Sequence, residues 1–450
     1  MIEPQVFKAN DIRGLVGGEH PEWDLDGARA IGAAFAAAFE LSGREFVIGR
    51  DMRAGGRELS QAFADGAMGQ GAGVVDVGLA STDGLWFASG YTHLPGVQFT
   101  ASHNPASYNG VKFCLPDAAP ITPELMARIR ELSYVELPAA ETRGSYRTQD
   151  VLGAYAAHLH SLVDLSGMRR LKVVVDAGNG MGGFTTPAVL GPLDIEVIGL
   201  FLDLDGSFPN HQPNPLEPEN LLDAQRAVRE HGADLGLVFD GDADRCFIID
   251  ERGEVVSPSV VTALIARSEL AREPGGTIVV NTITSRAVAE VVAAAGGKLT
   301  TSVVGHTRMK AAMAEQNAIF GGEHSAHYYF RDFWRADTGM LAGLHVIALL
   351  GRTGRPMSEL AAELPQYAAS GEINSVVDDA KAVMAQVADA FTGRGGISWV
   401  DGLLVSGVDW WVSVRESNTE PLLRLNVEAR DADTVAALRD EALAIIRKDR

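Results

Sequence analysis

The sequence predicts an α/β protein with three similar α/β domains, each with a mixed sheet, and a C-terminal α+β domain, all around a central cleft. Short apolar runs rich in β-branched residues, ending in Gly, Asp, Asn or Ser, recur in three sets of three. Ala-rich or amphipathic stretches such as Glu58–Gly71, Leu221–His231 and Ser285–Ala295 separate many of them. This alternation indicates helices layered on largely buried strands.

The third run of each set leads straight into a polar loop. The loops are Ala101–Pro105, Asp240–Arg245 and Gly321–His327. Ligand sites in α/β sheets commonly lie at strand ends, so we expect the three loops to converge on one cleft. The nine runs are Phe46–Gly49, Val74–Val77, Gly96–Thr100, Lys172–Val175, Ile195–Gly199, Leu235–Phe239, Thr277–Val280, Leu299–Val303 and Ala318–Phe320.

The C-terminal part of the chain has a different pattern. Four strand-like runs form a meander that precedes a helical stretch at Asp433–Lys448, which indicates an α+β domain. The predicted domains are residues 1–148, 149–252, 253–367 and 368–450. No low-complexity linker separates them, so we expect compact domains around a shared site. The four runs are Gly395–Val400, Gly402–Val405, Trp410–Val414 and Leu422–Glu428.

The charge of the chain restricts its partners. Its 450 residues include 59 Asp and Glu against 38 Lys and Arg, for a net charge of −21. Such a chain repels nucleic-acid backbones and anionic membranes, and no obligate protein partner is evident. The two cysteines fit a reducing compartment, and neither a signal peptide nor a membrane span is recognisable. We therefore expect a soluble cytoplasmic protein that acts on small molecules.

The loop after Phe239 carries three carboxylates within five residues, at Asp240, Asp242 and Asp244. Carboxylates this close repel one another unless a cation neutralises them, and an all-oxygen ligand set suits Mg²⁺ or Ca²⁺. An EF-hand that starts at Asp240 needs Gly at its sixth position, where Arg245 stands, so Mg²⁺ is preferred. The alternative is a solvated acidic turn.

Ser102 lies just past a strand-like run, and Pro105 prevents immediate continuation into a helix. Its neighbour His103 suggests a hydrolase dyad, but adjacent side chains on an extended backbone diverge, and no Gly-x-Ser-x-Gly elbow is present. Beside a magnesium loop, Ser102 is better interpreted as a phosphoryl acceptor whose phosphate supplies an oxygen to the cation. A capping or turn serine is the alternative.

Two further loops have the composition of a sugar-phosphate site. Glu323, Ser325 and His327 alternate along the third loop, and their carboxylate, hydroxyl and imidazole suit the vicinal hydroxyls of a sugar. In the tail, Arg415–Pro421 combines an arginine, two hydroxyls, an amide and backbone N–H groups that suit a phosphate. A polar strand exit and a plain hairpin connection are the respective alternatives.

A glycine pattern supports a rival hypothesis. Gly178, Gly180 and Gly183 follow the run Lys172–Asp176 and match Gly-x-Gly-x-x-Gly, the fingerprint of dinucleotide binding. A dinucleotide-dependent oxidoreductase explains this loop but leaves the other four unassigned. A third hypothesis is a catalytically silent protein that binds a metal or senses a sugar phosphate.

Taken together, the loops resemble the α-D-phosphohexomutase superfamily, most closely its phosphomannomutase/phosphoglucomutase branch. The resemblance runs over nearly the whole chain and implies four domains, three of them with one topology and the fourth flexible. It rests on Phe7–Gly14, Gly49–Arg53, Thr100–Pro105, Asn109–Lys112, Asp240–Arg245, Gly305-His306, Gly322–His327 and Arg415–Pro421.

The resemblance also implies roles for individual residues. Ser102 would be the phosphoserine and would share the magnesium site with Asp240, Asp242 and Asp244. The other candidates for catalysis are Lys112, His306, Arg13 and His103. The candidates for substrate binding are Arg245, Glu323, Ser325, His327, Arg415, Ser417, Asn418 and Thr419.

The implied reaction interconverts hexose 1-phosphate and hexose 6-phosphate through a phosphoserine and a hexose 1,6-bisphosphate, which would also serve as activator. The implied ligands are therefore sugar phosphates and Mg²⁺. His324 stands where a Gln would resemble the glucosamine-phosphate mutases. Mannose and glucose phosphates are preferred for this reason, with phosphoglucosamine mutase as the alternative.

Overall fold

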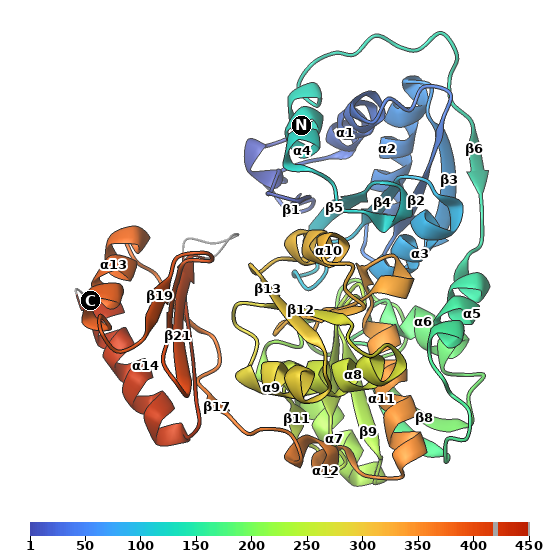
Figure 1. Ribbon diagram of the computed structural model, residues 1–450. Coiled ribbons are helices and arrows are strands. Elements are labelled where there is room, and N and C mark those ends of the chain that lie inside the picture. The colour runs from blue at the N-terminus through green and yellow to red at the C-terminus, as the bar shows by residue number, and fades with distance from the viewer. Residues whose placement is uncertain (417–421, 449–450) are drawn as a thin grey trace.

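The computed structural model describes residues 1–416 and 422–448 and shows four domains, each with its own sheet (Figure 1). The first three are α/β domains, and the fourth is an α+β domain beside the third, at the left in Figure 1. This arrangement confirms the predicted fold class. Within the described part of the chain, no helix is long and apolar enough to cross a membrane.

The sheet of the first domain has six strands in the order β1-β5-β4-β2-β3-β6. β2 pairs in parallel with β3 and β4, whereas β5 runs antiparallel to both β4 and β1. The strands are β1 (Asp11–Leu15), β2 (Glu45–Arg50), β3 (Gly73–Leu79), β4 (Gly96–Phe99), β5 (Tyr108–Cys114) and β6 (Tyr146–Thr148). The helices are α1 (Leu25–Ala38), α2 (Gly56–Gly69), α3 (Thr82–Thr92) and α4 (Pro123–Leu132).

The second domain repeats the central part of this sheet. Its order is β11-β10-β9-β7-β8, with β7 parallel to both β8 and β9, and with β10 returning antiparallel to β9. The strands are β7 (Leu171–Asp176), β8 (Ile195–Leu200), β9 (Leu235–Phe239), β10 (Cys246–Ile249) and β11 (Val255–Val256). The helices are α5 (Leu152–Leu162), α6 (Gly182–Val189) and α7 (Leu222–His231).

The third domain has the same arrangement again. Its order is β13-β12-β14-β15-β16, with β12 parallel to its two neighbours and β15 antiparallel to β14. The strands are β12 (Thr277–Asn281), β13 (Lys298–Ser302), β14 (Phe320–Gly322), β15 (Tyr328–Phe330) and β16 (Ala336–Asp337). The helices are α8 (Pro258–Arg272), α9 (Arg286–Ala294), α10 (His306–Glu315), α11 (Gly339–Thr353) and α12 (Met357–Ala362).

The nine predicted runs correspond to nine parallel strands, β2–β4, β7–β9 and β12–β14, whereas β6, which pairs in parallel with β3, was not predicted. The three polar loops therefore occupy equivalent positions, each between the third parallel strand of a domain and the antiparallel strand that follows it. The sequence pattern missed those antiparallel strands because they are short or mixed in character. β5, for example, carries Asn109, Gly110 and Lys112 among its apolar residues.

In the fourth domain, antiparallel strands in the order β17-β22-β21-β20-β19 pack against two helices, with β18 also paired to β22. The four predicted runs of the meander and the last helix are confirmed. The strands are β17 (Ala368–Ala369), β18 (Ile373–Ser375), β19 (Gly396–Ser398), β20 (Leu403–Ser406), β21 (Trp410–Glu416) and β22 (Leu423–Ala429), and the helices are α13 (Ala380–Ala390) and α14 (Ala432–Ile446).

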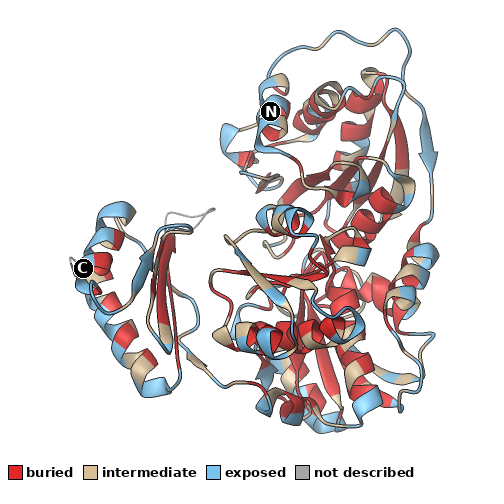
Figure 2. Cartoon of the chain, viewed as in Figure 1, coloured by how far each residue is buried: buried red, intermediate tan, exposed pale blue. Residues whose placement is uncertain are grey.

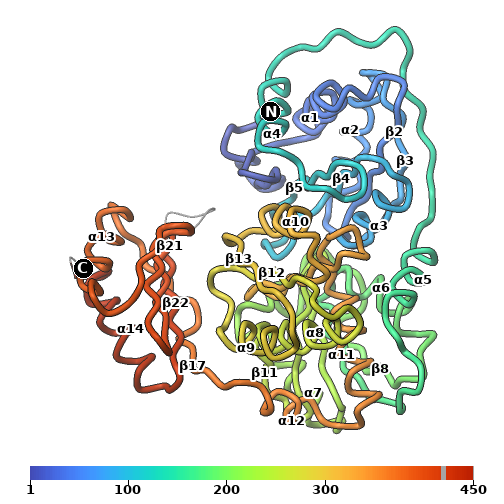
Figure 3. The backbone as a smooth tube through the Cα atoms, in the orientation of Figure 1, coloured from blue at the N-terminus to red at the C-terminus, as the bar shows by residue number. Residues whose placement is uncertain are grey.

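The hydrophobic cores show how the domains are joined. One core runs through the second and third domains and includes α3 of the first, whereas most of the first domain and all of the fourth have cores of their own. Figure 2 shows the buried residues along the sheets and the exposed ones on the outer faces of helices such as α14. Figure 3 shows the chain passing from α12 through β17 into the fourth domain.

Contacts between the third and fourth domains are largely polar. Asp401 Oδ2 accepts hydrogen bonds from Thr282 Oγ1 at 2.7 Å and from the Val304 amide at 3.0 Å. Arg286 Nη2 donates to the carbonyl oxygens of Gly407 at 2.8 Å and Trp410 at 3.2 Å. Polar contacts of this kind hold the fourth domain without a shared apolar core.

Candidate active site

Three loops from three domains meet at one place. They are the serine loop Thr100–Pro105, the acidic loop Asp240–Arg245 and the glutamate loop Gly321–His327. Ser102 Oγ donates to Asp240 Oδ2 at 2.8 Å, which joins the first two loops. Arg245 and His327 form an antiparallel backbone bridge, which joins the last two. The predicted convergence of the three loops is therefore observed.

The backbone of the serine loop is strained at its central residue. Ser102 has φ of +50°, in the left-handed region that costs a residue with a side chain about 1–2 kcal/mol. Its side chain is buried, and its amide donates to Thr100 Oγ1 at 2.9 Å. Strain of this kind persists where the surroundings fix the backbone.

Arg53 fixes the serine loop. Its Nη2 donates to the carbonyl oxygens of Ser102 at 2.8 Å and Asn104 at 2.7 Å, and its Nη1 donates to that of Pro105 at 2.8 Å. The guanidinium is buried and also pairs with Asp51 at 3.2 Å. Because one planar cation holds several carbonyl oxygens, it sets the shape of the loop.

The structure corrects one expectation about Ser102 and His103. Ser102 Oγ lies 3.3 Å from His103 Nδ1, so the two neighbouring side chains do not diverge. The left-handed backbone at Ser102 replaces the extended conformation on which that expectation depended. Burial holds the pKa of His103 well below its usual value, and the nearby Arg245 and Arg13 charges lower it further, so the imidazole is neutral.

The acidic loop gathers three carboxylates around two cations. The ligand atoms of Asp240, Asp242 and Asp244 lie within 4.8 Å of one another. Lys112 Nζ donates to Asp242 Oδ2 at 2.8 Å and to Asp244 Oδ2 at 2.6 Å, and Arg245 Nη2 donates to Asp240 Oδ2 at 2.8 Å. Asp242 Oδ1 is buried without a hydrogen-bond donor among the described residues. Direct ion pairs therefore link each of the three carboxylates to one of two cations, Lys112 or Arg245.

Burial and charge shift the ionisation of these groups in different directions. Burial raises the pKa of Asp240 to about 7, with Arg245 opposing it and the neighbouring carboxylates adding to it. Burial acts to raise the pKa of Asp244 as well, but Lys112 and His327 hold it well below its usual value. Burial opposes ionisation of Lys112, yet the two carboxylates that it bridges raise its pKa, so Lys112 is an ammonium donor at neutral pH.

The Gly-x-Gly-x-x-Gly turn packs against the acidic loop. The Met181 amide donates to the Gly241 carbonyl oxygen at 2.9 Å, and a Cβ at Gly180 would lie 2.6 Å from that same oxygen. A Cβ at Gly183 would lie 2.0 Å from the carbonyl oxygen of Leu202. Close backbone packing therefore accounts for two of the three glycines without a dinucleotide.

Glu323 is held in a fixed orientation. Its side chain is 2% exposed, and its Oε1 accepts from Asn281 Nδ2 and from the Gly305 amide, both at 3.2 Å. Its Oε2 accepts from the Tyr329 hydroxyl at 2.6 Å. Three donors from separate segments thus orient this carboxylate.

His327 connects the glutamate loop with the acidic loop. Its Nδ1 lies 2.8 Å from Ser325 Oγ, and its Nε2 lies 3.4 Å from Asp244 Oδ1. Burial acts to lower the pKa of His327, but the Asp244 carboxylate raises it above its usual value. His327 is therefore adjacent to the metal-ligand candidate Asp244 as well as to Glu323, and Ser325 contacts His327.

Arg13 and His306 approach from the first and third domains. Arg13, on β1, donates through Nη1 to Asn104 Oδ1 at 2.8 Å and through Nη2 to Asp11 Oδ2 at 2.7 Å. It therefore contacts the serine loop. His306 begins α10, and burial lowers its pKa to about 4 although the Asp337 carboxylate opposes the shift. Its imidazole is therefore neutral at pH 7.

Arg415 lies at the end of β21 in the fourth domain. Its Nη2 donates to Glu372 Oε2 at 2.8 Å, and its buried Nε has no partner among the described residues. Burial lowers the pKa of Arg415, and the Glu372 and Glu323 charges act to raise it, so this arginine is electrostatically coupled to the glutamate loop. The other residues predicted in this loop, Ser417, Asn418 and Thr419, lie outside the described residues.

Several residues at the site were given no role of their own from the sequence, although Arg53 and Asn104 lie in motifs that carry the family resemblance. Thr82 Oγ1 donates to Asp242 Oδ2 at 2.6 Å, and Asn104, Tyr329 and Arg53 hold the groups described above. The position of Arg53 could have been noticed from the sequence, because it follows the end of the predicted strand Phe46–Gly49, just as the three polar loops follow other predicted strands. Thr82 carries none, because its contact with Asp242 spans 160 residues of sequence.

Family models for four consecutive domains match the chain. They describe the α/β/α domains I, II and III of phosphoglucomutase/phosphomannomutase, at residues 4–135, 153–253 and 257–367, and its C-terminal domain, at residues 372–445. Together these matches cover most of the chain.

Individual relatives match over nearly their full length. A protein named "Phosphohexose mutases" from Xanthomonas campestris pv. campestris is 39% identical, with 98% of each chain covered. A phosphomannomutase from Escherichia coli K12 is 37% identical, with 94% of each chain covered. A solved structure of a phosphoglucomutase/phosphomannomutase family protein from Burkholderia thailandensis superposes with a TM-score of 0.90 at 32% identity, covering 100% of this chain and 99% of the other.

Proposed function

Because the chain belongs to the phosphoglucomutase/phosphomannomutase family and is therefore a phosphohexomutase, we propose that it interconverts the 1-phosphates and 6-phosphates of mannose and glucose. The intermediates are phosphorylated Ser102 and a hexose 1,6-bisphosphate. The observation that carries this proposal is the 2.8 Å contact between Ser102 Oγ and Asp240 Oδ2. This contact brings the buried hydroxyl of Ser102, a residue with a strained backbone, to a cluster of carboxylates and cations. Such a cluster is a suitable setting for phosphoryl transfer.

The cycle consists of two transfers. In the first, the bond between phosphorus and Ser102 Oγ breaks as a bond forms to the free hydroxyl of the hexose monophosphate. The bisphosphate then turns around, and Ser102 Oγ takes the other phosphoryl group. In the first transfer the sugar hydroxyl loses a proton and Ser102 Oγ gains one, and the second transfer reverses this. His306, Lys112 and Arg13 are the candidates for moving these protons and for stabilising the charge on the transferring group.

The residues present fit a Mg²⁺ ion, which would neutralise charge on the transferring phosphoryl group. The acidic loop offers an all-oxygen donor set, and Asp242 Oδ1 has no hydrogen-bond donor among the described residues. Asp240, Asp242 and Asp244 would hold the ion, with a further oxygen from the phosphate on Ser102. Lys112 bridges Asp242 and Asp244, and Arg245 pairs with Asp240, so both residues carry positive charge to this place.

Sugar and distal phosphate are assigned to the third and fourth domains. Glu323, Ser325 and His327 would bind sugar hydroxyls, with Arg245 orienting the substrate. Arg13 and His103 lie beside the serine loop, where they would contact the phosphoryl group. The phosphate that does not react would bind Arg415, whose buried Nε lacks a partner among the described residues, and the loop at Ser417, Asn418 and Thr419.

The domain boundaries that we propose follow residues 148, 252 and 367. The first boundary follows β6, the last strand of the first sheet, which ends at Thr148. The last one precedes β17, the first strand of the fourth sheet, which begins at Ala368. A catalytic site shared among these domains explains why its residues are spread over the whole chain.

A single assay series tests the proposed substrates. Purified protein is given Mg²⁺ and catalytic hexose 1,6-bisphosphate with mannose, glucose or glucosamine 1-phosphate, and kcat/KM is compared. We expect a higher kcat/KM with mannose and glucose 1-phosphates than with glucosamine 1-phosphate. The reason is that His324 stands where a Gln would resemble the glucosamine-phosphate mutases. Preference for glucosamine 1-phosphate would contradict the sugar assignment. If the protein turns over substrate only when bisphosphate is added, the result supports the proposed intermediate.

A further inference from the structure

Thr82, the first residue of α3, binds the metal-ligand candidate Asp242 at two points. Its Oγ1 donates to Asp242 Oδ2 at 2.6 Å, and its amide donates to the Asp242 carbonyl oxygen at 2.9 Å. Both residues are fully buried. One bond fixes the backbone of Asp242 and the other fixes its carboxylate. A residue of the first domain therefore sets the orientation of a carboxylate that belongs to the second.

The two carboxylate oxygens of Asp242 have different surroundings. Oδ2 accepts from Thr82 and also from Lys112 Nζ at 2.8 Å, whereas Oδ1 is buried and has no hydrogen-bond donor among the described residues. A buried carboxylate oxygen without a donor is unfavourable unless a cation or another donor comes to it. The two donors on Oδ2 therefore leave Oδ1 as the oxygen that is available to Mg²⁺.

Thr82 fixes the direction of this carboxylate more closely than Lys112 does. The Lys112 ammonium is shared between Asp242 Oδ2 and Asp244 Oδ2, and it stands at the end of a flexible four-carbon side chain. Thr82 has a short β-branched side chain, which is stiff about its only torsion between carbon atoms. Lys112 therefore supplies charge to the carboxylate, and Thr82 supplies its orientation.

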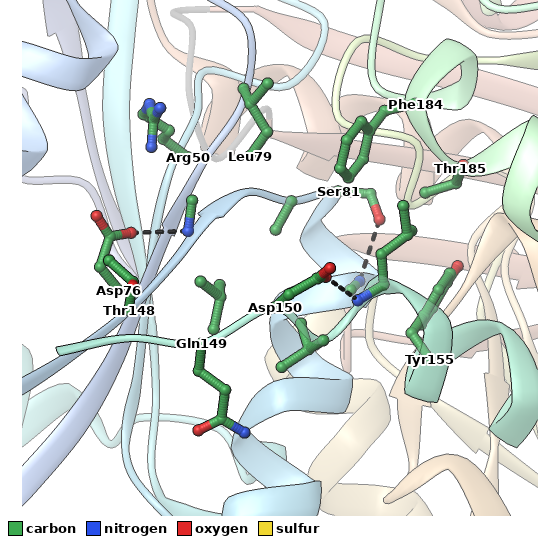
Figure 4. A pocket seen from close by; sticks show the side chains of 16 residues that line it. Arg50, Asp76, Leu79, Ser81, Thr148, Gln149, Asp150, Tyr155, Phe184 and Thr185 are labelled. Atoms are coloured by element: carbon green, nitrogen blue, oxygen red, sulfur yellow. Dashed lines mark hydrogen bonds between the residues drawn. The ribbon is translucent and has the colours of Figure 1, made fainter.

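The start of α3 is anchored to the second and third domains as well. Asp83 Oδ2 accepts from the Tyr155 hydroxyl of the second domain at 2.6 Å and from the Thr338 hydroxyl of the third at 2.7 Å, and its Oδ1 accepts from the Ser81 hydroxyl. A cavity of about 530 Å³ lies beside this turn, with Ser81 and Tyr155 on its wall (Figure 4). Because packing on that side is incomplete, these hydrogen bonds hold Thr82 in place.

We propose that Thr82 is a positioning residue of the metal site, which holds Asp242 so that Oδ1 is left for the cation. This inference rests on the proposed function, because it takes the acidic loop as the site of Mg²⁺. Residues that hydrogen-bond to metal ligands without binding the metal change its affinity or the activity about 10–100-fold when they are replaced. Loss of the Thr82 hydroxyl should therefore weaken cation binding.

Two pairs of proteins isolate the hydroxyl group. Thr82→Val differs from the wild type only by a methyl group in place of the hydroxyl, and Thr82→Ala differs from Thr82→Ser only by the missing hydroxyl. Calorimetric titration of the full chain with Mg²⁺ measures the Kd without any turnover. Intact-protein mass spectrometry first establishes that all variants have the same phosphorylation state. We expect Thr82→Val to raise the Kd about tenfold or more, and Thr82→Ser to bind Mg²⁺ nearly as the wild type does.

Thr186→Val is the matched control, because Thr186 is a buried threonine of α6 whose hydroxyl has no hydrogen-bond partner among the described residues. A lower Tm of Thr82→Val with an unchanged Kd would show a merely structural role and overturn the proposal. If Asp242→Asn weakens Mg²⁺ binding and Thr82→Val does not, the positioning role is wrong and the metal site stands. If Asp242→Asn has no effect either, the metal site itself is wrong. If Thr82→Val does not fold, the comparison of Thr82→Ala with Thr82→Ser decides the question.

Discussion

The Arg53 guanidinium donates to the carbonyl oxygen of Ser102 at 2.8 Å, although the two residues are 49 positions apart. Ser102 has a left-handed backbone, and Arg53 also holds the carbonyl oxygens of two residues that follow it. The position of the proposed nucleophile therefore depends on an arginine that does not itself reach the acidic loop by any described hydrogen bond.

Arg53→Lys should reduce kcat without abolishing folding, because an ammonium cannot span several carbonyl oxygens as a planar fork does. Each charged hydrogen bond contributes about 1.5–3 kcal/mol, so loss of one at the serine loop corresponds to a fall of about 10–150-fold. The rate of Ser102 phosphorylation by bisphosphate and the steady-state kcat measure the effect. Arg128→Lys is the control, and a wild-type rate in Arg53→Lys would show that the loop holds its shape unaided.

Ser102→Ala should eliminate the phosphoenzyme. Neither His103 nor Asn104 supplies a hydroxyl, so no adjacent side chain replaces the acceptor. Intact-protein mass spectrometry after incubation with hexose 1,6-bisphosphate should show one added phosphate on the wild type and none on the variant. Undiminished turnover by Ser102→Ala would refute the assigned nucleophile.

Asp242→Asn should weaken magnesium binding while nearly preserving the shape of the loop. The variant loses one of three anionic ligands, and Lys112 loses one of its two carboxylate partners. The activity of the variant should be far below that of the wild type at ordinary Mg²⁺ concentrations. Excess Mg²⁺ should restore it only in part, which a titration of activity against Mg²⁺ concentration measures. The exposed variant Asp389→Asn is the comparison. A wild-type magnesium curve for Asp242→Asn would indicate a solvated turn.

Arg415→Ala should impair both directions of the reaction, because one clamp must hold either phosphate. Loss of a charge-assisted contact of about 1.5–3 kcal/mol lowers kcat/KM about 10–150-fold. Lys at this position should restore part of the activity. The measurement is kcat/KM from each 1-phosphate and each 6-phosphate, together with phosphoenzyme content at saturating bisphosphate, which should stay detectable. Loss in one direction alone would rule out a shared clamp.

Asp83 predicts a pH dependence of stability. Burial raises its pKa to about 6, although hydroxyls of Ser81, Tyr155 and Thr338 donate to it and oppose the shift, and the Asp244 charge adds to it. Because the folded state binds this proton more tightly than the unfolded chain, the contribution of Asp83 to the free energy of unfolding decreases between about pH 4 and pH 6. Above that range the contribution no longer changes with pH. The total decrease in the free energy of unfolding is about 3 kcal/mol.

Asp83→Asn stays neutral and should lack this decrease. The Tm of the variant relative to the wild type should therefore increase from pH 4.5 to pH 6 and then level off. Differential scanning fluorimetry over pH 4.5–8 measures the difference, with Asp389→Asn as an exposed control. A Tm difference that does not change with pH would mean that Asp83 ionises normally in the folded protein.

The sequence by itself determined the parallel strands and the loops that follow them. Buried parallel strands such as Leu235–Phe239 are continuous apolar runs, and this is a local property that a single segment displays. The aspartates of the acidic loop lie within five residues of one another, so their mutual repulsion is also visible locally. Short antiparallel strands such as Tyr328–Phe330 have no comparable periodicity, and the pattern missed them.

The tertiary structure decided how these loops are combined. Ser102 and Asp240 are 138 residues apart, and Asp83 and Thr338 are 255 apart, yet each pair is hydrogen-bonded. Local composition does not encode such contacts, because they depend on how whole domains pack. The left-handed backbone at Ser102 is likewise held by Arg53 from outside the loop, which is why the sequence predicted divergent Ser102 and His103 side chains and the folded chain brings them within 3.3 Å.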